Sequence, residues 1–442
     1  MTQTSWVLSL SQFYLSLGFL LLFLALELGL AWVLFALRLR ERHSTAARLA
    51  YRFWVRVFAL TLVLSFGASL PLLLQLGTLW PRLMDRAGEV VGPLVAMAIL
   101  TTFVFKSCFL GAMLYGQRSL SDRAHSVVVG MVALGTSLTA YWVATLLAWM
   151  QWPVGTTLTE GHYEVTDWLT VLGGAAPLVF GVLLTGGLVL AGTLMLAVTA
   201  VRTDTRPSDD GDRGVYAAGL WLVVFALVLQ TVLVAQLGRT LLPVQPARAA
   251  AVIPQWQTGA PGRLTLLAWP DAEAHRNAWA VRGPQTPSWL PLAAGRSLRG
   301  LDDLAGVRPP VWLTYMSSRL AAVLVGLLAL AALWSLWRGW CLHYEPDGLP
   351  RLARVRLRAL MWGAVLLQCV GWAHLMLGSL PYAIYGTVTL REIGTSQDSE
   401  TLWGGLGVHG LVYAALAVGF YQLLRHTTRF GVVPVARHRG RA

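Results

Sequence analysis

Two charged side chains stand inside long apolar stretches, where charge is costly. Lys106 is the only lysine among 442 residues and lies in the apolar stretch 91–116, and Glu27 lies in the apolar stretch 9–37. Ionisable residues inside membrane segments usually pair with one another or line a functional path. The sequence therefore predicts an intramembrane ion pair between Glu27 and Lys106. The alternative is that each side chain reaches water or the membrane surface independently.

Two histidines also lie in apolar stretches, His374 in 356–380 and His409 in 403–424. Two imidazoles on facing helices can hold a low-spin haem through its axial positions. The alternative is that each imidazole is a hydrogen-bonded packing residue or a proton relay. No Cys/His spacing typical of a metal site occurs, and neither do P-loop or Ser/His/Asp patterns.

The elements that carry these residues are long apolar segments. Apolar residues make up 56% of the chain and charged residues only 12%, compared with about 25% charged residues in ordinary soluble domains. A membrane-spanning helix needs about 20 apolar residues, and helices satisfy their own backbone hydrogen bonds in lipid. We therefore predict an all-α integral membrane protein with about nine transmembrane helices, at 9–37, 53–79, 91–116, 125–151, 170–200, 214–243, 312–338, 356–380 and 403–424.

The connecting segments predict an orientation for these helices. Arginines concentrate in the first, third and seventh connections and in the C-terminal tail, whereas the short even-numbered connections are neutral or acidic. Basic residues are retained on the cytoplasmic side. The N-terminus is therefore expected outside and the C-terminus in the cytoplasm, which requires an odd number of spans. This pattern accounts for the net charge of +13 without nucleic-acid binding. The fifth connection, with four aspartates, is an exception.

One connection is much longer than the others. We divide the chain into a six-span N-terminal region (1–243), an outer loop (244–311), a three-span C-terminal region (312–424) and a basic cytoplasmic tail (425–442). Loops of this length are usually functional or disordered, and its tryptophans Trp256, Trp269 and Trp279 argue against disorder. Glycines within the spans, Gly29, Gly111, Gly135 and Gly186, are expected to allow close helix packing.

Several motifs resemble subunit I of cytochrome bd-type quinol oxidases over nearly the whole chain. The similar segments are Leu10–Phe13, Leu76–Trp80, Ala133–Trp142 followed by Trp149–Gly155, Trp256–Thr258, Pro270–Glu273 with Asn277, and Gly371–Trp372 with Gly378 and Pro381. The strongest match is the fourth span, where the spacing of two motifs agrees as well. The resemblance implies a nine-span fold, three haems, quinol oxidation at the outer loop and oxygen reduction at haem d.

The residues that would bind haem in such a protein are replaced in this sequence. By the resemblance, the span-one histidine falls on Leu20, and the two span-three glutamates fall on Met97 or Ala98 and on Lys106. The span-five histidine falls on Gly181 or Val182 and the span-seven methionine on Ala321. Because leucine, glycine and alanine cannot coordinate iron, the resemblance implies the fold without its usual haems.

The remaining correspondences concern the eighth span and the outer loop. The span-eight glutamate falls on Met376 and the arginine after it on Ser379, while the lysine and glutamate of the quinol loop fall on Arg248 and Ile253. Arg248, Trp256 and Trp269 are candidates for a quinol pocket, but interfacial anchoring is the alternative for the tryptophans. With Ile253 in place of the acid, no general base is evident.

Three functions remain open. The first is a non-catalytic scaffold subunit of a bd-type quinol oxidase in a bacterial inner membrane. It would carry no cofactor itself and would form a heterodimer with an intact subunit I that holds haem b and haem d, with a small single-span subunit as a further partner. The second is a redox-active haem subunit that uses His374 and His409. The third is a transporter or sensor with Lys106 and Glu27 on its path. In the first, the Glu27–Lys106 pair would fill space that a haem would otherwise occupy.

Overall fold

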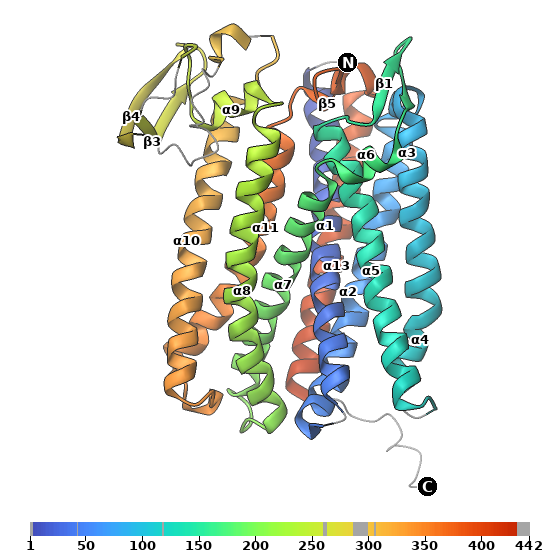
Figure 1. The fold of residues 1–442 in the computed structure, drawn as a ribbon, viewed down its shortest axis with the longest axis vertical. Coiled ribbons are helices and arrows are strands. Elements are labelled where there is room, and N and C mark those ends of the chain that lie inside the picture. The colour runs from blue at the N-terminus through green and yellow to red at the C-terminus, as the bar shows by residue number, and fades with distance from the viewer. Residues whose placement is uncertain are drawn as a thin grey trace.

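Long helices packed side by side form the membrane region of the computed structural model, which describes residues 3–41, 43–116, 119–259, 263–285, 299–304 and 306–430 (Figure 1). Within these residues nine helices are long and apolar enough to span a membrane. They are α1 (Gln3–Arg40), α2 (Thr45–Thr78), the continuous α3–η1–α4 (Pro81–Thr101, Thr102–Ser107 and Cys108–Tyr115), α5 (Asp122–Gln151), α6–α7 (Trp168–Gly173 and Ala176–Arg202), α8 (Asp210–Leu241), α10 (Val311–Cys341), α11 (Arg351–Leu377) and α13 (Ser399–Phe430).

The predicted number of spans is confirmed, but the helices are longer than predicted. Helix α2 begins at Thr45 instead of 53 because the Ser44 hydroxyl accepts the backbone N–H of Ala47 and caps the helix. The third span begins at Pro81 instead of 91, since proline is well suited to a first helical turn, and it is kinked at Ala87, where the backbone is not helical. Helix α13 continues to Phe430, and the rest of the predicted basic tail lies outside the described residues.

The core lies around α1 and α7, which are the most buried spans. A Cβ atom on Gly29 would lie 2.1 Å from the carbonyl oxygen of Gly187, so the two backbones touch at this point. The predicted packing role holds for Gly29, Gly135 and Gly186, where an added Cβ would meet a neighbour. It is wrong for Gly111, which faces open space. Helix α1 also packs against α11 and α13, so the six-span and three-span regions form one bundle.

Three antiparallel hairpins, not predicted from the sequence, lie at one end of the bundle. We call this the upper end, because the N-terminus and the hairpins lie at the top of Figure 1. The hairpins are β1–β2 (Thr156–Thr159 and His162–Val165), β3–β4 (Arg263–Asp271 and Arg276–Gln285) and β5–β6 (Tyr382–Ile384 and Val388–Thr389). In the described parts of the connections there are four short helices: α9 (Pro246–Val252), η3 (Asp302–Leu304), η4 (Pro346–Gly348) and α12 (Leu390–Ile393).

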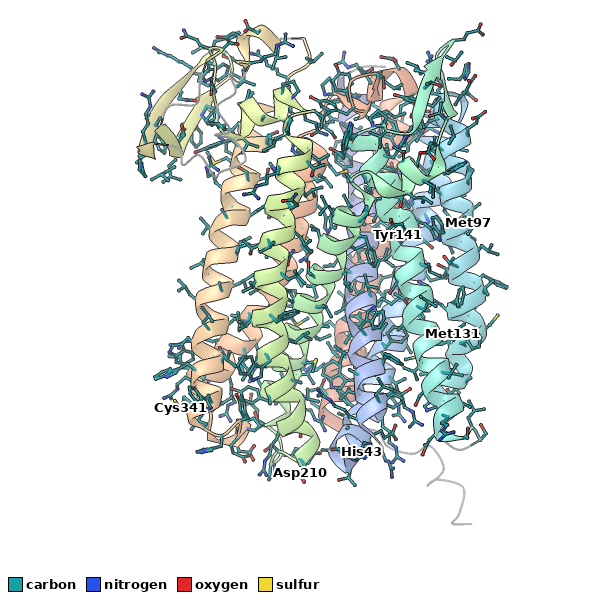
Figure 2. All side chains as sticks on the ribbon, viewed as in Figure 1. His43, Met97, Met131, Tyr141, Asp210 and Cys341 are labelled. Atoms are coloured by element: carbon teal, nitrogen blue, oxygen red, sulfur yellow. The ribbon has the colours of Figure 1, made fainter. Side chains whose placement is uncertain are left out.

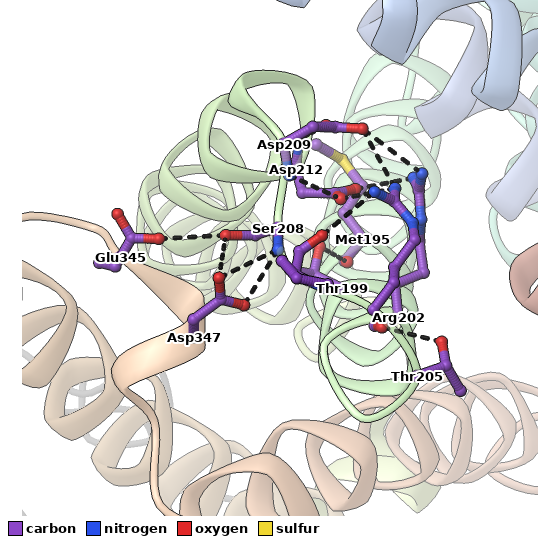
Figure 3. Close-up of polar contacts among 11 residues, drawn as sticks. Met195, Thr199, Arg202, Thr205, Ser208, Asp209, Asp212, Glu345 and Asp347 are labelled. Atoms are coloured by element: carbon purple, nitrogen blue, oxygen red, sulfur yellow. Dashed lines mark hydrogen bonds and ion pairs between the residues drawn. The ribbon is translucent and has the colours of Figure 1, made fainter.

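Ion pairs connect the loops at the opposite, lower end, which His43, Asp210 and Cys341 mark in Figure 2. Arg202 at the end of α7 lies 2.7 Å from Asp212 at the start of α8, and Arg206 lies 2.7 Å from the same carboxylate (Figure 3). Burial opposes ionisation of Asp209, but the backbone N–H of Asp212 and the two guanidinium groups outweigh it and lower the pKa of Asp209.

The same loop is also bound to the α10–α11 connection. The backbone N–H of Ser208 donates to Asp347 at 3.0 Å, and the Ser208 hydroxyl donates to Glu345 at 3.0 Å (Figure 3). Asp204 pairs with Arg354 and Arg358 at the start of α11. The aspartates that make this loop an exception to the basic pattern therefore serve as local partners for arginines.

Candidate functional site

A short π-helical segment directs the Lys106 side chain toward the interior of the bundle. Residues Thr102–Ser107 form the π-helix η1 between α3 and α4. The wider turn changes the face that each residue presents, and such turns often occur at functional sites. Phe103, Val104 and Ser107 face outward, whereas Lys106 is 3% exposed. The only lysine of the chain is therefore directed away from lipid.

The structure brings Lys106 and Glu27 together, as the sequence predicts. The Lys106 Nζ atom lies 3.1 Å from Glu27 Oε1, and both side chains are buried. Glu27 also accepts hydrogen bonds from Ser65 on α2 and, at 3.3 Å, from Thr136 on α5. One carboxylate thus connects α1, α2, η1 and α5. A buried carboxylate with several donors is the arrangement that low-dielectric surroundings require.

An apolar cavity of about 290 Å³ lies beside this ion pair. Its lining comes mainly from α1, α2, α3 and α5, with contributions from α11 and the β5–α12 segment. Lys106 and Ser65 line one end, and Gln151 and Tyr382 line the other end, near the top of the bundle. Leucine, valine and phenylalanine side chains make up most of the remaining wall.

Three of the positions at which the resemblance places haem ligands line this one cavity, Leu20, Ala98 and Lys106, together with the eighth-span positions Met376 and Ser379. Met97, the alternative to Ala98, is half-buried on α3 (Figure 2). No histidine, cysteine or carboxylate is present in the described lining. Its thioethers belong to Met150 and Met376, but methionine usually binds haem iron together with histidine. These residues do not fit the haems of the resembled family.

The other two replaced positions also lack donor atoms. Gly181 lies in α7 close to α8, where a Cβ atom would lie 3.0 Å from the Leu233 side chain. Ala321 in α10 packs against the apolar core. Within the described residues, no three His, Cys, Asp or Glu side chains cluster closely enough to hold a metal ion.

His374 and His409, the candidate haem pair, have hydrogen-bond partners on different helices. His374 Nδ1 is 3.0 Å from the Ser317 hydroxyl on α10. His409 Nδ1 is 2.7 Å from the Gly405 carbonyl and 3.2 Å from the Gln12 amide on α1. Such hydrogen bonds are what the alternative interpretation, that each imidazole is a packing residue, expects.

Arg248 is a buried cation at the upper end. It lies on α9 at 6% exposure and donates to Gln245 Oε1 at 3.1 Å and to Gln151 Oε1 at 3.4 Å. Burial lowers its pKa to about 10, so it is protonated at neutral pH. A Cβ atom on Gly378 would lie 2.6 Å from Arg248 Nε, so glycine at 378 makes room for the guanidinium. Arg248 forms no ion pair within the described residues.

The two candidate tryptophans have partners of their own. Trp256 is buried with Ala250, Leu301 and Val311, and its indole N–H donates to Asn277 Oδ1 at 3.1 Å. Trp269 is about half exposed and contacts Trp312 edge to face at 5.7 Å. None of Arg248, Trp256 and Trp269 lines the apolar cavity beside Lys106. Trp256 holds the loop onto α9 and α10, and Trp269 has the exposure expected of an interfacial anchor.

Trp256→Ala should therefore destabilise the outer loop without unfolding the helix bundle. The indole fills the small core under the β3–β4 hairpin, and truncation of a buried tryptophan typically costs about 3–5 kcal/mol. Limited proteolysis should cleave Trp256→Ala in the loop several times faster than the unmodified protein. Trp279→Ala, which removes an exposed tryptophan on β4, is the control. Equal cleavage of both variants would contradict the anchoring role.

The sequence did not reveal the cavity or two of the hydrogen-bond donors to Glu27. Ser65 and Thr136 belong to α2 and α5, far from Glu27 in the chain. Serine and threonine are common in apolar helices because their hydroxyl can donate to a backbone carbonyl one turn earlier. The Thr136 hydroxyl lies 3.0 Å from the Val132 carbonyl oxygen in this way. Their type alone therefore carries no signal of a buried carboxylate.

Comparison with known proteins identifies a family that has this fold. The family model described as "Cytochrome bd terminal oxidase subunit I" matches residues 8–432. The chain belongs to this family. It is 23% identical over 441 residues to "Cytochrome bd ubiquinol oxidase subunit 1" of Bacillus subtilis, covering 93% of this chain and 90% of that protein. The fold and the nine helices establish a multi-pass protein of the bacterial inner membrane.

Two further comparisons define how far the similarity reaches. The chain is 28% identical over 305 residues to "Cytochrome bd-II ubiquinol oxidase subunit 1" of Escherichia coli, which covers 66% of this chain but only 57% of that protein. The structure of bd oxidase from Geobacillus thermodenitrificans superposes with a TM-score of 0.86 at 20% identity, covering 97% of this chain and 99% of the other. The fold of the subunit I family therefore extends over essentially the whole chain.

Proposed function

We propose that this chain is a non-catalytic scaffold subunit of a cytochrome bd-type quinol:oxygen oxidoreductase. The observation that carries the proposal is the cavity at which three replaced haem-ligand positions meet without a histidine or carboxylate in its described lining. The relatives are named ubiquinol oxidase subunits, and aerobic respiratory electron transport is the process in which this complex would take part. Haem b and haem d would be held by an intact subunit I.

The proposed role is to cover and stabilise the haem-bearing partner within the membrane. Among the spans of the described residues, α13 is the least buried, with 11% of its most apolar window buried. Two nine-span subunits that pack through this face would remove it from lipid, as interfaces between membrane helices do. The proposed orientation puts the hairpin-bearing upper end outside and the arginine-rich lower end in the cytoplasm.

Affinity purification of the tagged chain from its native membranes tests the proposed role. We expect a second subunit I chain with histidine and glutamate at the haem-ligand positions to co-purify in equal amount, together with the haem. Recovery of the tagged chain as a haem-free protein without any respiratory partner would contradict the scaffold role and favour a transporter or sensor. Recovery with a partner that lacks haem ligands would contradict it as well.

A further inference from the structure

The cavity beside Lys106 raises the question of what fills it. We propose that it binds the acyl chain of a membrane lipid that enters between α2 and α3. This inference rests on the proposed function, because it requires that haem does not occupy the same space. It adds a ligand class and a binding site that the scaffold role does not by itself require.

The size and lining of the cavity favour a hydrocarbon ligand. Its volume of about 290 Å³ is roughly twice that of an engineered apolar cavity of about 150 Å³ that stays dry and binds benzene. Protein interiors rarely keep voids larger than a water molecule. Water would find few partners here, since leucine side chains such as Leu17, Leu24 and Leu73 dominate the wall.

The route from the bilayer is marked by lining residues that are also exposed. Phe66 and Leu70 on α2 are 47% and 52% exposed, and Ile99 and Phe103 on α3 and η1 are 50% and 64% exposed. These side chains belong to membrane spans, so the medium that reaches them is lipid. A chain can therefore enter sideways between α2 and α3 without crossing a polar surface.

The ends of the cavity indicate how the chain would lie. Near the upper end the wall includes Gln151, Ser379 and Tyr382, whereas the deep end is formed by Ser65 and Lys106. The charge of Lys106 is balanced by Glu27 at 3.1 Å, so the deep end offers no free cation for an anionic headgroup. A lipid of the upper leaflet would thus keep its headgroup at the membrane surface and direct its methyl end toward the ion pair.

A filled-cavity variant tests the proposal in the purified complex. Ala98 lines the cavity, whereas Ala96 lies two residues away on the same helix, is exposed and is absent from the lining. Ala98→Phe should displace the chain, and Ala96→Phe is the matched control. Native mass spectrometry after exhaustive delipidation should show one fewer phospholipid per complex in Ala98→Phe than in the unmodified protein or in Ala96→Phe.

Other outcomes would overturn the proposal. Equal phospholipid numbers in all three proteins would show that no lipid chain depends on this cavity. Loss of an isoprenoid quinone instead of a phospholipid in Ala98→Phe, identified by its mass, would show that the occupant is a different molecule. Haem bound to this chain when it is purified alone would contradict the proposed function itself. The absorption spectrum reveals that outcome independently of the lipid measurement.

Discussion

Lys106→Ala is expected to reduce sharply the amount of folded protein that can be purified in detergent. The substitution leaves Glu27 buried with only hydroxyl donors, Ser65 and Thr136. Removing one partner of a buried ion pair typically destabilises by about 3–5 kcal/mol, because the remaining charge is unpaired. Yield after size-exclusion chromatography and the midpoint temperature of unfolding measure the effect.

Two further variants distinguish charge loss from a general effect of substitution at this turn. Ser107→Ala changes the outward-facing neighbour of Lys106 and should leave yield and midpoint close to those of the unmodified protein. The double variant Lys106→Met with Glu27→Gln removes both charges and keeps similar volumes, so it should recover most of the loss. Unchanged yield of Lys106→Ala alone would show that the ion pair does not stabilise the bundle.

Gly29→Ala is expected to have a comparably large effect through sterics alone. The new methyl group would lie 2.1 Å from the Gly187 carbonyl oxygen, and a backbone atom cannot rotate away as a side chain can. Helices α1 and α7 would have to separate at the centre of the bundle, where overpacking costs about 3 kcal/mol or more. The midpoint temperature of unfolding in detergent should fall by several degrees.

Gly18→Ala on the same helix is the matched control, because no atom lies within 4 Å of its added Cβ. It should be neutral or slightly stabilising, since alanine favours a helix interior by about 0.5–1 kcal/mol over glycine. If both variants unfold at the same temperature, the close contact between α1 and α7 does not contribute to stability.

The spans could be predicted because lipid imposes a simple rule on sequence. Long apolar segments must form helices, so nine were found at nearly the correct places. The hairpins could not be predicted in the same way, since they lie in connections, where water can satisfy the backbone. In β3–β4 the strand pairing is interrupted by register shifts, which also breaks the alternation that would reveal strands. The helix ends were missed because caps such as Ser44 extend helices beyond the apolar segment.

The candidate site was only partly predictable for a related reason. A charge inside an apolar helix is conspicuous, so Glu27 and Lys106 could be paired from their rarity. The rotation that directs Lys106 inward depends on a π-turn, and the pattern of apolar residues does not indicate one. His374 and His409 were equally conspicuous, but helical position alone could not show that their side chains have separate partners on α10 and α1.

A reduced-minus-oxidised absorption spectrum of the isolated chain tests most directly whether it has the fold of subunit I without its haems. The chain should be produced in cells that make haem b and haem d, purified alone and then with its partner. We expect no haem bands for the chain alone and clear bands for the complex. Stoichiometric haem bands in the isolated chain would contradict it.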